Sequence, residues 1–225
     1  TFSGAFTSLG IDDNADATAI TITSAENVGI GTSSPSRVIS AKSSSVTVGN
    51  FESTSSTAGL VSFSDANTTN DVTVRVGAVG DNLVFQSGGT EHMRIDSTGA
   101  VTKPLQPAFQ VRKSANQENV SASDTVTTVI FDVEVFDNNA DFASNTFNAP
   151  VTGRYFLSTN VYLSAVDTAT GYILIGINTT NRNYYRIVDP NFSADLNYYG
   201  MNFSVLADLD AGDTAYIFWQ ANGGT

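Results

Sequence analysis

The sequence predicts an all-β protein, in which a region of short strands is followed by an antiparallel β-sandwich. Ser, Thr and Asn supply 25, 27 and 20 of the 225 residues, whereas Leu supplies ten and Lys three. Long amphipathic helices draw on Leu, Lys, Glu and Ala, so this composition argues against a helical bundle. Hydrophobic residues at 41% and charged residues at 14% make the chain too apolar and too weakly charged for disorder.

The composition also excludes several classes of function. The net charge is −12 and the ten Lys and Arg residues never cluster, so no basic surface is available for nucleic acid. The chain has no cysteine and one histidine, His92, which excludes thiolate metal sites and histidine-rich metal clusters. No apolar stretch approaches the ~20 residues that cross a bilayer. We therefore expect neither a nucleic-acid nor a membrane partner, and a chain that starts at Thr1 is expected to be a fragment.

The domain boundary is predicted at Lys103–Pro107, the one place where two prolines fall close together. Five aromatic residues precede this point and 18 follow it, so the second region has many more large apolar side chains for a core than the first. Stiff X-Pro pairs are typical of short linkers. We expect a β-rich region over residues 1–103, a linker over 104–107 and a sandwich domain over 108–225.

The N-terminal region contains short strand candidates separated by Gly, Ser, Asn and Asp. Apolar and polar residues alternate in Ala19–Thr23, Leu60–Ser64 and Val72–Val76. Ile22–Val28 and Ile95–Val101 both read as strand, tight turn and strand, and resemble two copies of one unit. Few large apolar side chains are present, so we expect these strands to find partners in other chains.

The C-terminal region contains many strand candidates with turn signals between them. They are Phe109–Arg112, Thr128–Val135, Thr146–Asn148, Arg154–Leu163, Tyr172–Asn178, Tyr184–Val188, Asn197–Leu206 and Thr214–Gln220. Strands at this spacing without helical intervals predict an antiparallel sandwich of the jelly-roll kind.

Two of these strands are apolar on both faces, Tyr172–Ile177 and Ala215–Trp219. The outer face of an antiparallel sandwich normally meets water, so an apolar outer face requires a cover. The economical cover is another copy of the chain. The candidate interface residues are Ile173, Ile175, Ile177, Tyr216, Phe218 and Trp219.

A spaced set of aromatic, proline and glycine residues carries a resemblance to a known family. The set is Phe131, Phe147, Ala149, Pro150, Gly153 and Tyr155, with Gly212 and Asp213 before the last apolar strand. Over about residues 107–222 the chain resembles the C1q/tumour-necrosis-factor-like jelly roll. The resemblance implies a ten-strand sandwich that assembles as a tight homotrimer.

The N-terminal region resembles the low-complexity shafts of bacteriophage tail fibres. The resemblance is carried by Ala19–Pro35 and Glu91–Val101. Together the two resemblances imply a fibre tip in a virion, with a shaft fragment, a linker and a trimeric knob. Other tail or fibre proteins would then contact the N-terminal side, and the knob would attach to a glycan or protein of the host surface.

Candidate ligand-binding residues form two tyrosine pairs with arginines nearby: Tyr184, Tyr185, Arg182, Arg186, Tyr198 and Tyr199. Aromatic faces stack on sugar rings, while arginine and asparagine side chains bond sugar hydroxyls. One tyrosine of each pair should point inward by strand alternation, so packing in the core or at a trimer contact is the alternative.

Other readings remain open on the sequence alone. The chain fits a head fibre or minor decoration protein with a purely structural role. It also fits a hydrolase of surface polysaccharide, with Asp132 and Glu134 as an acid pair on one strand face. We expect no cofactor, although calcium would suit Asp12–Asp16 or Asp137–Asp141; the alternative for both is a solvated polar loop.

Overall fold

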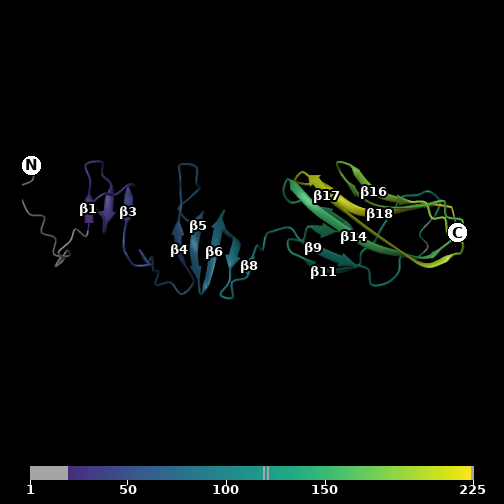
Figure 1. The fold of residues 1–225 in the computed structure, drawn as a ribbon, viewed down its shortest axis with the longest axis horizontal. Coiled ribbons are helices and arrows are strands. Elements are labelled where there is room, and N and C mark those ends of the chain that lie inside the picture. The colour runs from purple at the N-terminus through teal and green to yellow at the C-terminus, as the bar shows by residue number, and fades with distance from the viewer. Residues whose placement is uncertain (1–19, 119, 121, 224–225) are drawn as a thin grey trace, which may run out of the picture. The chain divides into compact units, whose positions relative to one another are not determined.

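The computed structural model describes residues 20–118, 120 and 122–223 (Figure 1). These residues form strands, turns and loops, and no helix is assigned among them. The chain divides into two compact units, Thr1–Thr102 and Lys103–Thr225. The expected boundary at 103–107 falls beside this division.

The first sheet of the first unit contains three short strands. They are β1 (Ile20–Ile22), β2 (Val28–Ile30) and β3 (Ile39–Ala41). β1 pairs with β2 antiparallel, and β2 pairs with β3 parallel. Ile20, Ile22, Ile30 and Ile39 are each at least half exposed, so this sheet has almost no core of its own.

The second sheet of this unit is a five-stranded antiparallel meander. It contains β4 (Gly59–Ser62), β5 (Arg75–Val79), β6 (Asn82–Ser87), β7 (Thr90–Ile95) and β8 (Val101–Thr102) in that order. The strand expected at Val72–Val76 begins only at Arg75. The Asn70 side chain accepts hydrogen bonds from the Val72 amide (3.0 Å) and the Thr73 hydroxyl (2.9 Å), which holds a turn where alternation predicts a strand.

The two predicted copies of one unit are both hairpins in the structure. Ile22 pairs with Val28, and Ile95 pairs with Val101. In the first turn the Asn27 amide donates to Thr23 Oγ1 at 3.1 Å; in the second the Ala100 amide donates to Asp96 Oδ1 at 3.0 Å. The prediction of a repeated strand–turn–strand unit is confirmed.

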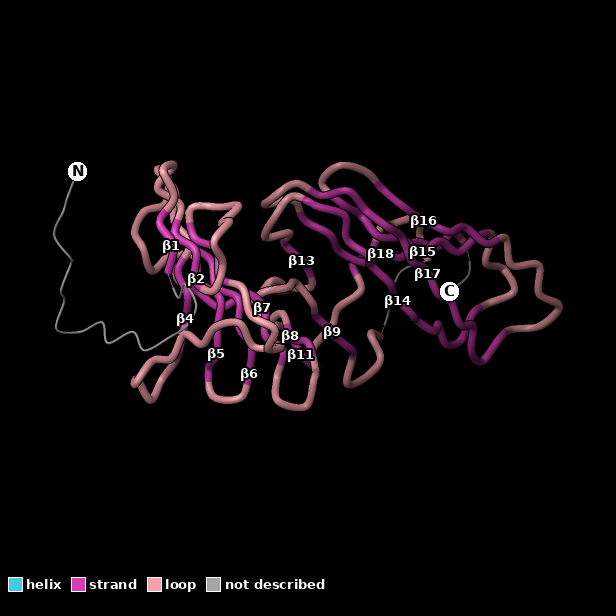
Figure 2. The backbone as a smooth tube through the Cα atoms, turned by 60° about the vertical axis from the view of Figure 1, so that its left-hand side comes forward, coloured by secondary structure: helices cyan, strands magenta, loops and turns pink. Residues whose placement is uncertain are grey.

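The second unit is a sandwich with a six-stranded sheet on one side (Figures 1 and 2). Its strands are β12 (Phe142–Ala143), β13 (Thr146–Asn148), β18 (Thr214–Asn222), β15 (Tyr172–Thr179) and β16 (Asn183–Val188), with β10 (Thr127–Thr128) also paired to β18. The other side contains two separate pairs, β14 (Gly153–Val166) with β17 (Leu196–Leu209), and β9 (Phe109–Arg112) with β11 (Val133–Asp137). All of these pairings are antiparallel.

The single strand expected at Thr128–Val135 is divided into β10 and β11. Side chains bind the backbone groups of the intervening residues and so replace a ladder. The Ile130 amide donates to Gln117 Oε1 at 2.9 Å, and the Phe131 amide donates to Asn145 Oδ1 at 2.8 Å. The other strands predicted in this unit form close to their expected positions, with β14 and β17 longer than expected at 14 residues each. The short strand β12 was not predicted.

Three of the residues that carry the resemblance, Phe147, Ala149 and Tyr155, belong to or pack against one core cluster of the second unit. Phe147 is 2% exposed, and its ring centroid lies 5.1 Å from that of Phe109 and 5.2 Å from that of Tyr155. The Tyr155 hydroxyl donates to the Val151 carbonyl at 2.6 Å. Gly212 has a φ of +91° and its amide donates to the Ala149 carbonyl, so this turn requires glycine.

Candidate functional site

The structure separates the predicted tyrosine cluster into two places. Tyr184 and Tyr185 lie on β16, at the edge of the six-stranded sheet, whereas Tyr198 and Tyr199 lie on β17 of the opposite side. Asp208, which contacts Tyr184, is ten residues from Tyr198 along β17 (208 − 198). Ten residues of strand span roughly 33 Å, so the two tyrosine pairs do not form one site.

Arg182, directly before β16, and Tyr184 of β16 connect the two sides of the sandwich through Asp208 of β17. Arg182 Nη2 lies 2.7 Å from Asp208 Oδ2, and the Tyr184 hydroxyl donates to Asp208 Oδ1 at 3.2 Å. The Arg182 guanidinium also lies 5.9 Å from the centroid of the Tyr184 ring. Partial burial raises the pKa of Tyr184, and Asp208 adds to this effect. Tyr185 (56% exposed) and Arg186 remain open to solvent on the same strand.

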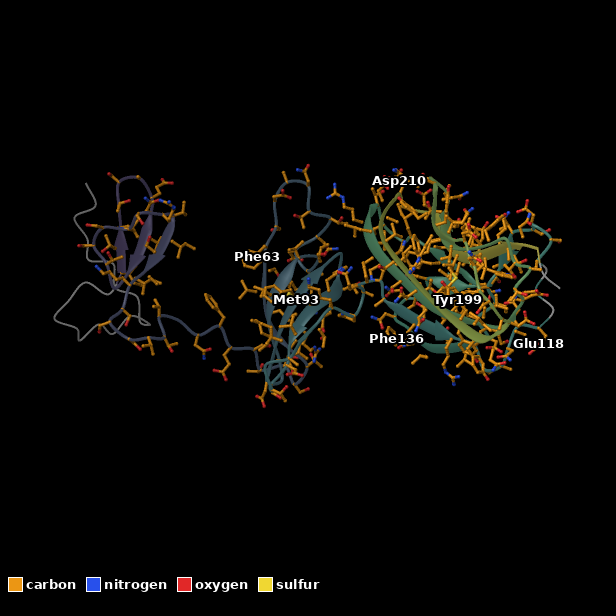
Figure 3. The ribbon with its side chains drawn as sticks, turned by 45° about the vertical axis from the view of Figure 1, so that its right-hand side comes forward. Phe63, Met93, Glu118, Phe136, Tyr199 and Asp210 are labelled. Atoms are coloured by element: carbon orange, nitrogen blue, oxygen red, sulfur yellow. The ribbon has the colours of Figure 1, made fainter. Side chains whose placement is uncertain are left out.

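The β17 tyrosines have opposite environments, as strand alternation predicts. Tyr199 packs in the core, with its ring centroid 5.5 Å from that of Phe192 (Figure 3). Tyr198 is 72% exposed and meets Tyr162 of β14 edge to face, at 5.9 Å between ring centroids. Tyr162 is itself 61% exposed. An exposed aromatic pair therefore lies on the outer face of the β14–β17 ribbon, and half of it was missed by the sequence reasoning.

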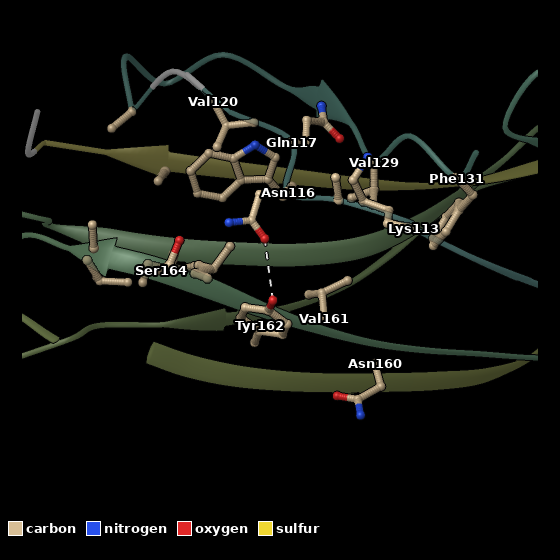
Figure 4. A pocket seen from close by; sticks show the side chains of 18 of the residues that line it. Lys113, Asn116, Gln117, Val120, Val129, Phe131, Asn160, Val161, Tyr162 and Ser164 are labelled. Atoms are coloured by element: carbon tan, nitrogen blue, oxygen red, sulfur yellow. Dashed lines mark hydrogen bonds between the residues drawn. The ribbon is translucent and has the colours of Figure 1, made fainter. Parts of the chain in front are cut away.

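Polar side chains surround this aromatic pair. The Tyr162 hydroxyl donates to Asn116 Oδ1 at 3.4 Å (Figure 4). Asn160 of β14 stands directly opposite Asn202 of β17, and both side chains are exposed. Alternation places Asn160 and Tyr162 on the same face of β14. Two ring surfaces and several amide groups thus occur together on this outer face.

An apolar pair occupies the other end of the same outer face. Phe156 of β14 stands directly opposite Leu206 of β17, and the two side chains are 73% and 61% exposed. Phe156 falls within the family motif, but neither residue was predicted as a contact residue. Large exposed side chains in direct register form the kind of patch that marks a protein contact.

The residues predicted at the trimer interface lie mostly inside one chain. Ile173, Ile175, Ile177 and Trp219 are each less than 10% exposed and belong to the two core clusters. Phe218 projects to the opposite face of β18 from Trp219 and is 5% exposed, because its ring covers Gly176. Tyr216, on the same face as Phe218, is half-buried. The apolar character of these strands is thus explained within one protomer and no longer requires a second chain.

Asp132, one member of the predicted acid pair, is held by hydrogen bonds that favour its charged form. The Ser114 hydroxyl and amide donate to Asp132 at 2.6 and 2.7 Å, and these bonds lower the pKa of Asp132. A general acid in glycoside hydrolysis requires a raised pKa. Glu134, two residues after Asp132, is the second residue of β11 and is exposed.

The Asp137 carboxylate, one of the oxygen ligands considered for calcium, binds the protein's own backbone. Asp137 accepts hydrogen bonds from the amides of Asp141 (3.1 Å) and Phe142 (2.8 Å), so this segment is an ordered polar turn. Asp12–Asp16 lies outside the described residues. Among the residues that the structure describes, no group of three or more His, Asp or Glu side chains could hold a metal. The same part of the chain contains no helix long and apolar enough to cross a membrane.

Comparisons with known proteins leave the family open. No protein family and no curated protein matches the sequence. A solved structure described as the globular domain of zebrafish complement 1qA protein matches 53% of this chain and 84% of its own, with 20% identity and a TM-score of 0.41. A likeness at this level assigns neither a family nor a function.

Proposed function

We propose that this chain is a non-enzymatic fibre protein of a bacteriophage virion and that its C-terminal unit binds a glycan of the host surface. The observation that carries the binding role is the exposed pair of Tyr162 and Tyr198 beside Asn116, Asn160 and Asn202. Aromatic rings offer apolar faces to a sugar, and amides offer both donors and acceptors to its hydroxyls.

The two tyrosine side chains are held in place by neighbours but remain exposed, which supports ligand binding rather than packing alone. Each tyrosine has its ring edge or hydroxyl held by a neighbour, while 61% of Tyr162 and 72% of Tyr198 stay exposed. Rigid aromatic side chains lose little conformational entropy when a ligand binds. Tyr185 has a similar exposure but no aromatic partner among the described residues, so it is a weaker candidate.

The second part of the proposal is a homotrimer held through the outer face of β14 and β17. The apolar pair of Phe156 and Leu206 supplies the contact, and the tyrosine end of the same face stays open to the host. A single shallow sugar site binds weakly. Three copies on one particle raise the effective affinity without any new contact, because the later binding events are intramolecular.

The fibre role rests on the first unit. Its repeated hairpins and its Ser-, Thr- and Asn-rich sheets with exposed isoleucines are typical of an elongated region that is completed by other chains. In the virion this unit would join the other tail or fibre proteins. A head fibre or decoration protein would share this unit but would not compete for host cells.

The experiment measures how well the purified chain competes with phage particles for adsorption to host bacteria. It also measures binding of the chain to an array of the surface glycans of these bacteria. The purified chain is compared with Tyr162→Ala and Tyr198→Ala, and with Tyr185→Ala as the matched control of similar exposure. We expect the first two variants to lose glycan binding and competition for host cells, with unchanged solution mass, and the control to retain both. If the double variant, Tyr162→Ala with Tyr198→Ala, still competes fully for host cells, the assigned site is wrong. No competition by the unmodified chain would favour the purely structural role.

A further inference from the structure

One dipeptide of the second unit is chemically reactive. Asn222 and Gly223 form the only Asn–Gly pair, although the sequence contains 20 asparagines. The backbone nitrogen of the residue that follows an asparagine can attack the side-chain carbonyl carbon of that asparagine, and glycine hinders this attack least because it has no Cβ. Asn222 is the last residue of β18 and is exposed, so its side chain is open to water.

The fold requires glycine at position 223. Gly223 has a φ of +77°, and a Cβ there would lie 2.5 Å from the carbonyl oxygen of Ala169. The Asn222 carbonyl accepts a hydrogen bond from the Gly171 amide at 2.6 Å, so the end of β18 is held against the turn before β15. The residue that makes Asn222 reactive therefore cannot be exchanged without strain.

The side chain of Asn222 belongs to a small polar cluster around Asp124. The Asp124 carboxylate accepts hydrogen bonds from the Tyr172 hydroxyl, from Gln220 Nε2 at 2.7 Å and from the Asn222 side chain. These bonds, that of Tyr172 first, lower the pKa of Asp124, so the carboxylate is charged at neutral pH. An amide donor at position 222 thus faces a negative charge, whereas a carboxylate at this position would meet a like charge.

Asp124 holds its segment of the chain on the end of β18. Its amide donates to a carbonyl of β18 at 2.9 Å, and the neighbouring Ser123 forms a β-bridge with Asn222. Asp124 has a φ of +64°, a left-handed conformation that a non-glycine residue keeps only while its contacts hold it. Ala122 of the same segment packs against the core cluster that contains Trp219. Loss of the Asp124 contacts would therefore affect the core beside Trp219.

We propose that Asn222 is a site of spontaneous deamidation and that the new carboxylate releases the segment around Asp124 from β18. The Gly223 nitrogen gives up its proton and bonds to Cγ of Asn222, while the side-chain nitrogen takes up a proton and leaves as ammonia. Water then opens the cyclic imide at either carbonyl carbon, which gives aspartate or isoaspartate and adds a negative charge. These steps need neither an enzyme nor an oxidant. Asp124 repels the product, which has also lost the amide donor, so the cluster and the Ser123 bridge open.

Peptide mapping by mass spectrometry tests the reaction, with controls inside one peptide. The tryptic fragment that starts at Ile187 contains four asparagines, Asn191, Asn197, Asn202 and Asn222. The intact protein is incubated in mildly alkaline buffer, and conversion of each asparagine is followed over time. We expect Asn222 to convert about tenfold faster than the other three, since each of these precedes a bulky aromatic residue. Asn222→Gln should abolish conversion at this position. Equal conversion of all four asparagines, or none at Asn222, would overturn the assignment.

Asn222→Asp installs one product directly and tests its effect on the fold. We expect about tenfold faster hydrogen exchange of the Asp124 amide and a change in the fluorescence of Trp219, the only tryptophan. Asn197→Asp adds the same charge at an exposed position of β17 and should change neither readout. Combining Asp124→Asn with Asn222→Asp removes the like-charge contact and should restore slow exchange. Unchanged exchange in Asn222→Asp would overturn the release, and fast exchange in the double variant would overturn charge repulsion as its cause.

Discussion

Glu26 and Gly99 occupy the same position in two hairpins of the first unit, and both have a positive φ, of +62° and +92°. Each amide donates at 2.9 Å to the carbonyl three residues earlier, Thr23 or Asp96. One hairpin therefore uses the residue that this backbone favours, while the other keeps a glutamate in a left-handed conformation.

Replacing the two residues should have opposite effects on stability. A left-handed non-glycine residue costs about 1 kcal/mol, so Glu26→Gly should stabilise its hairpin by about that amount and Gly99→Ala should destabilise the other. Hydrogen exchange of the Asn27 and Ala100 amides reports each hairpin separately. A slower Ala100 exchange in Gly99→Ala would contradict this account.

Asp132 should make the fold sensitive to acid. The Ser114 hydroxyl and then its amide lower the pKa of Asp132 below the ordinary 3.8. Because the folded pKa is below the unfolded value, the stabilisation is present above pH ~4 and is lost as pH falls through the folded pKa. Carbon-detected NMR titration of Asp132 should show its pKa rise toward the ordinary value in Ser114→Ala. An unchanged titration would remove the Ser114 hydrogen bond as the cause.

Gly176 should tolerate no side chain. A Cβ there would lie 2.7 Å from two ring atoms of Phe218 and would also meet the Tyr184 carbonyl. We expect Gly176→Ala to destabilise the second unit by about 1–3 kcal/mol in urea unfolding, because an added methyl in a packed site forces its neighbours to move. Gly200→Ala is the control, since nothing lies within 4 Å of its added Cβ. Equal losses in both variants would show that strand propensity, and not the Phe218 contact, decides the result.

Phe147 and Phe156 should separate folding from assembly. Phe147 is 2% exposed and Phe156 is 73% exposed. Phe147→Ala should lower the free energy of unfolding by about 3–5 kcal/mol through lost burial and a cavity. Phe156→Ser with Leu206→Ser should leave the fold intact, as circular dichroism can verify, and lower the mass from a trimer to a monomer in light scattering. A trimer in this double variant would place the contact elsewhere.

Local sequence patterns predicted the strands and their faces well, but not the pairing between strands. Alternation alone places Tyr199 inside and Tyr198 outside, as the structure shows. The aromatic partner of Tyr198 depends on the register of β14 against β17, which sets residue 164 opposite residue 198. That register is a long-range property, so Tyr162 gave no signal that linked it to Tyr198.

The runs of apolar residues were interpreted as a contact with a second chain, although they are buried within one chain, for a related physical reason. In Ile173–Ile177 the odd-numbered side chains fill the core, and Gly176 on the outer face lies under the Phe218 ring. Leu174, also on the outer face, is 9% exposed. Sequence pattern cannot distinguish an outer face covered by a neighbouring ring from one covered by a second chain. The separation of the β9–β11 pair from the β14–β17 pair is likewise invisible in the sequence, because it depends on which strands pair.

The recessed position of the unpaired edges of β9 and β14 affects how the protein behaves at high concentration. Unpaired strand edges on a flat surface recruit other edges and promote aggregation. Here residues of both strands line the same two cavities of the sandwich, so each edge faces the other strand across a cavity. An edge in this position is less accessible to the edge strand of another folded molecule than an edge on an open surface, and this limits growth into ordered aggregates.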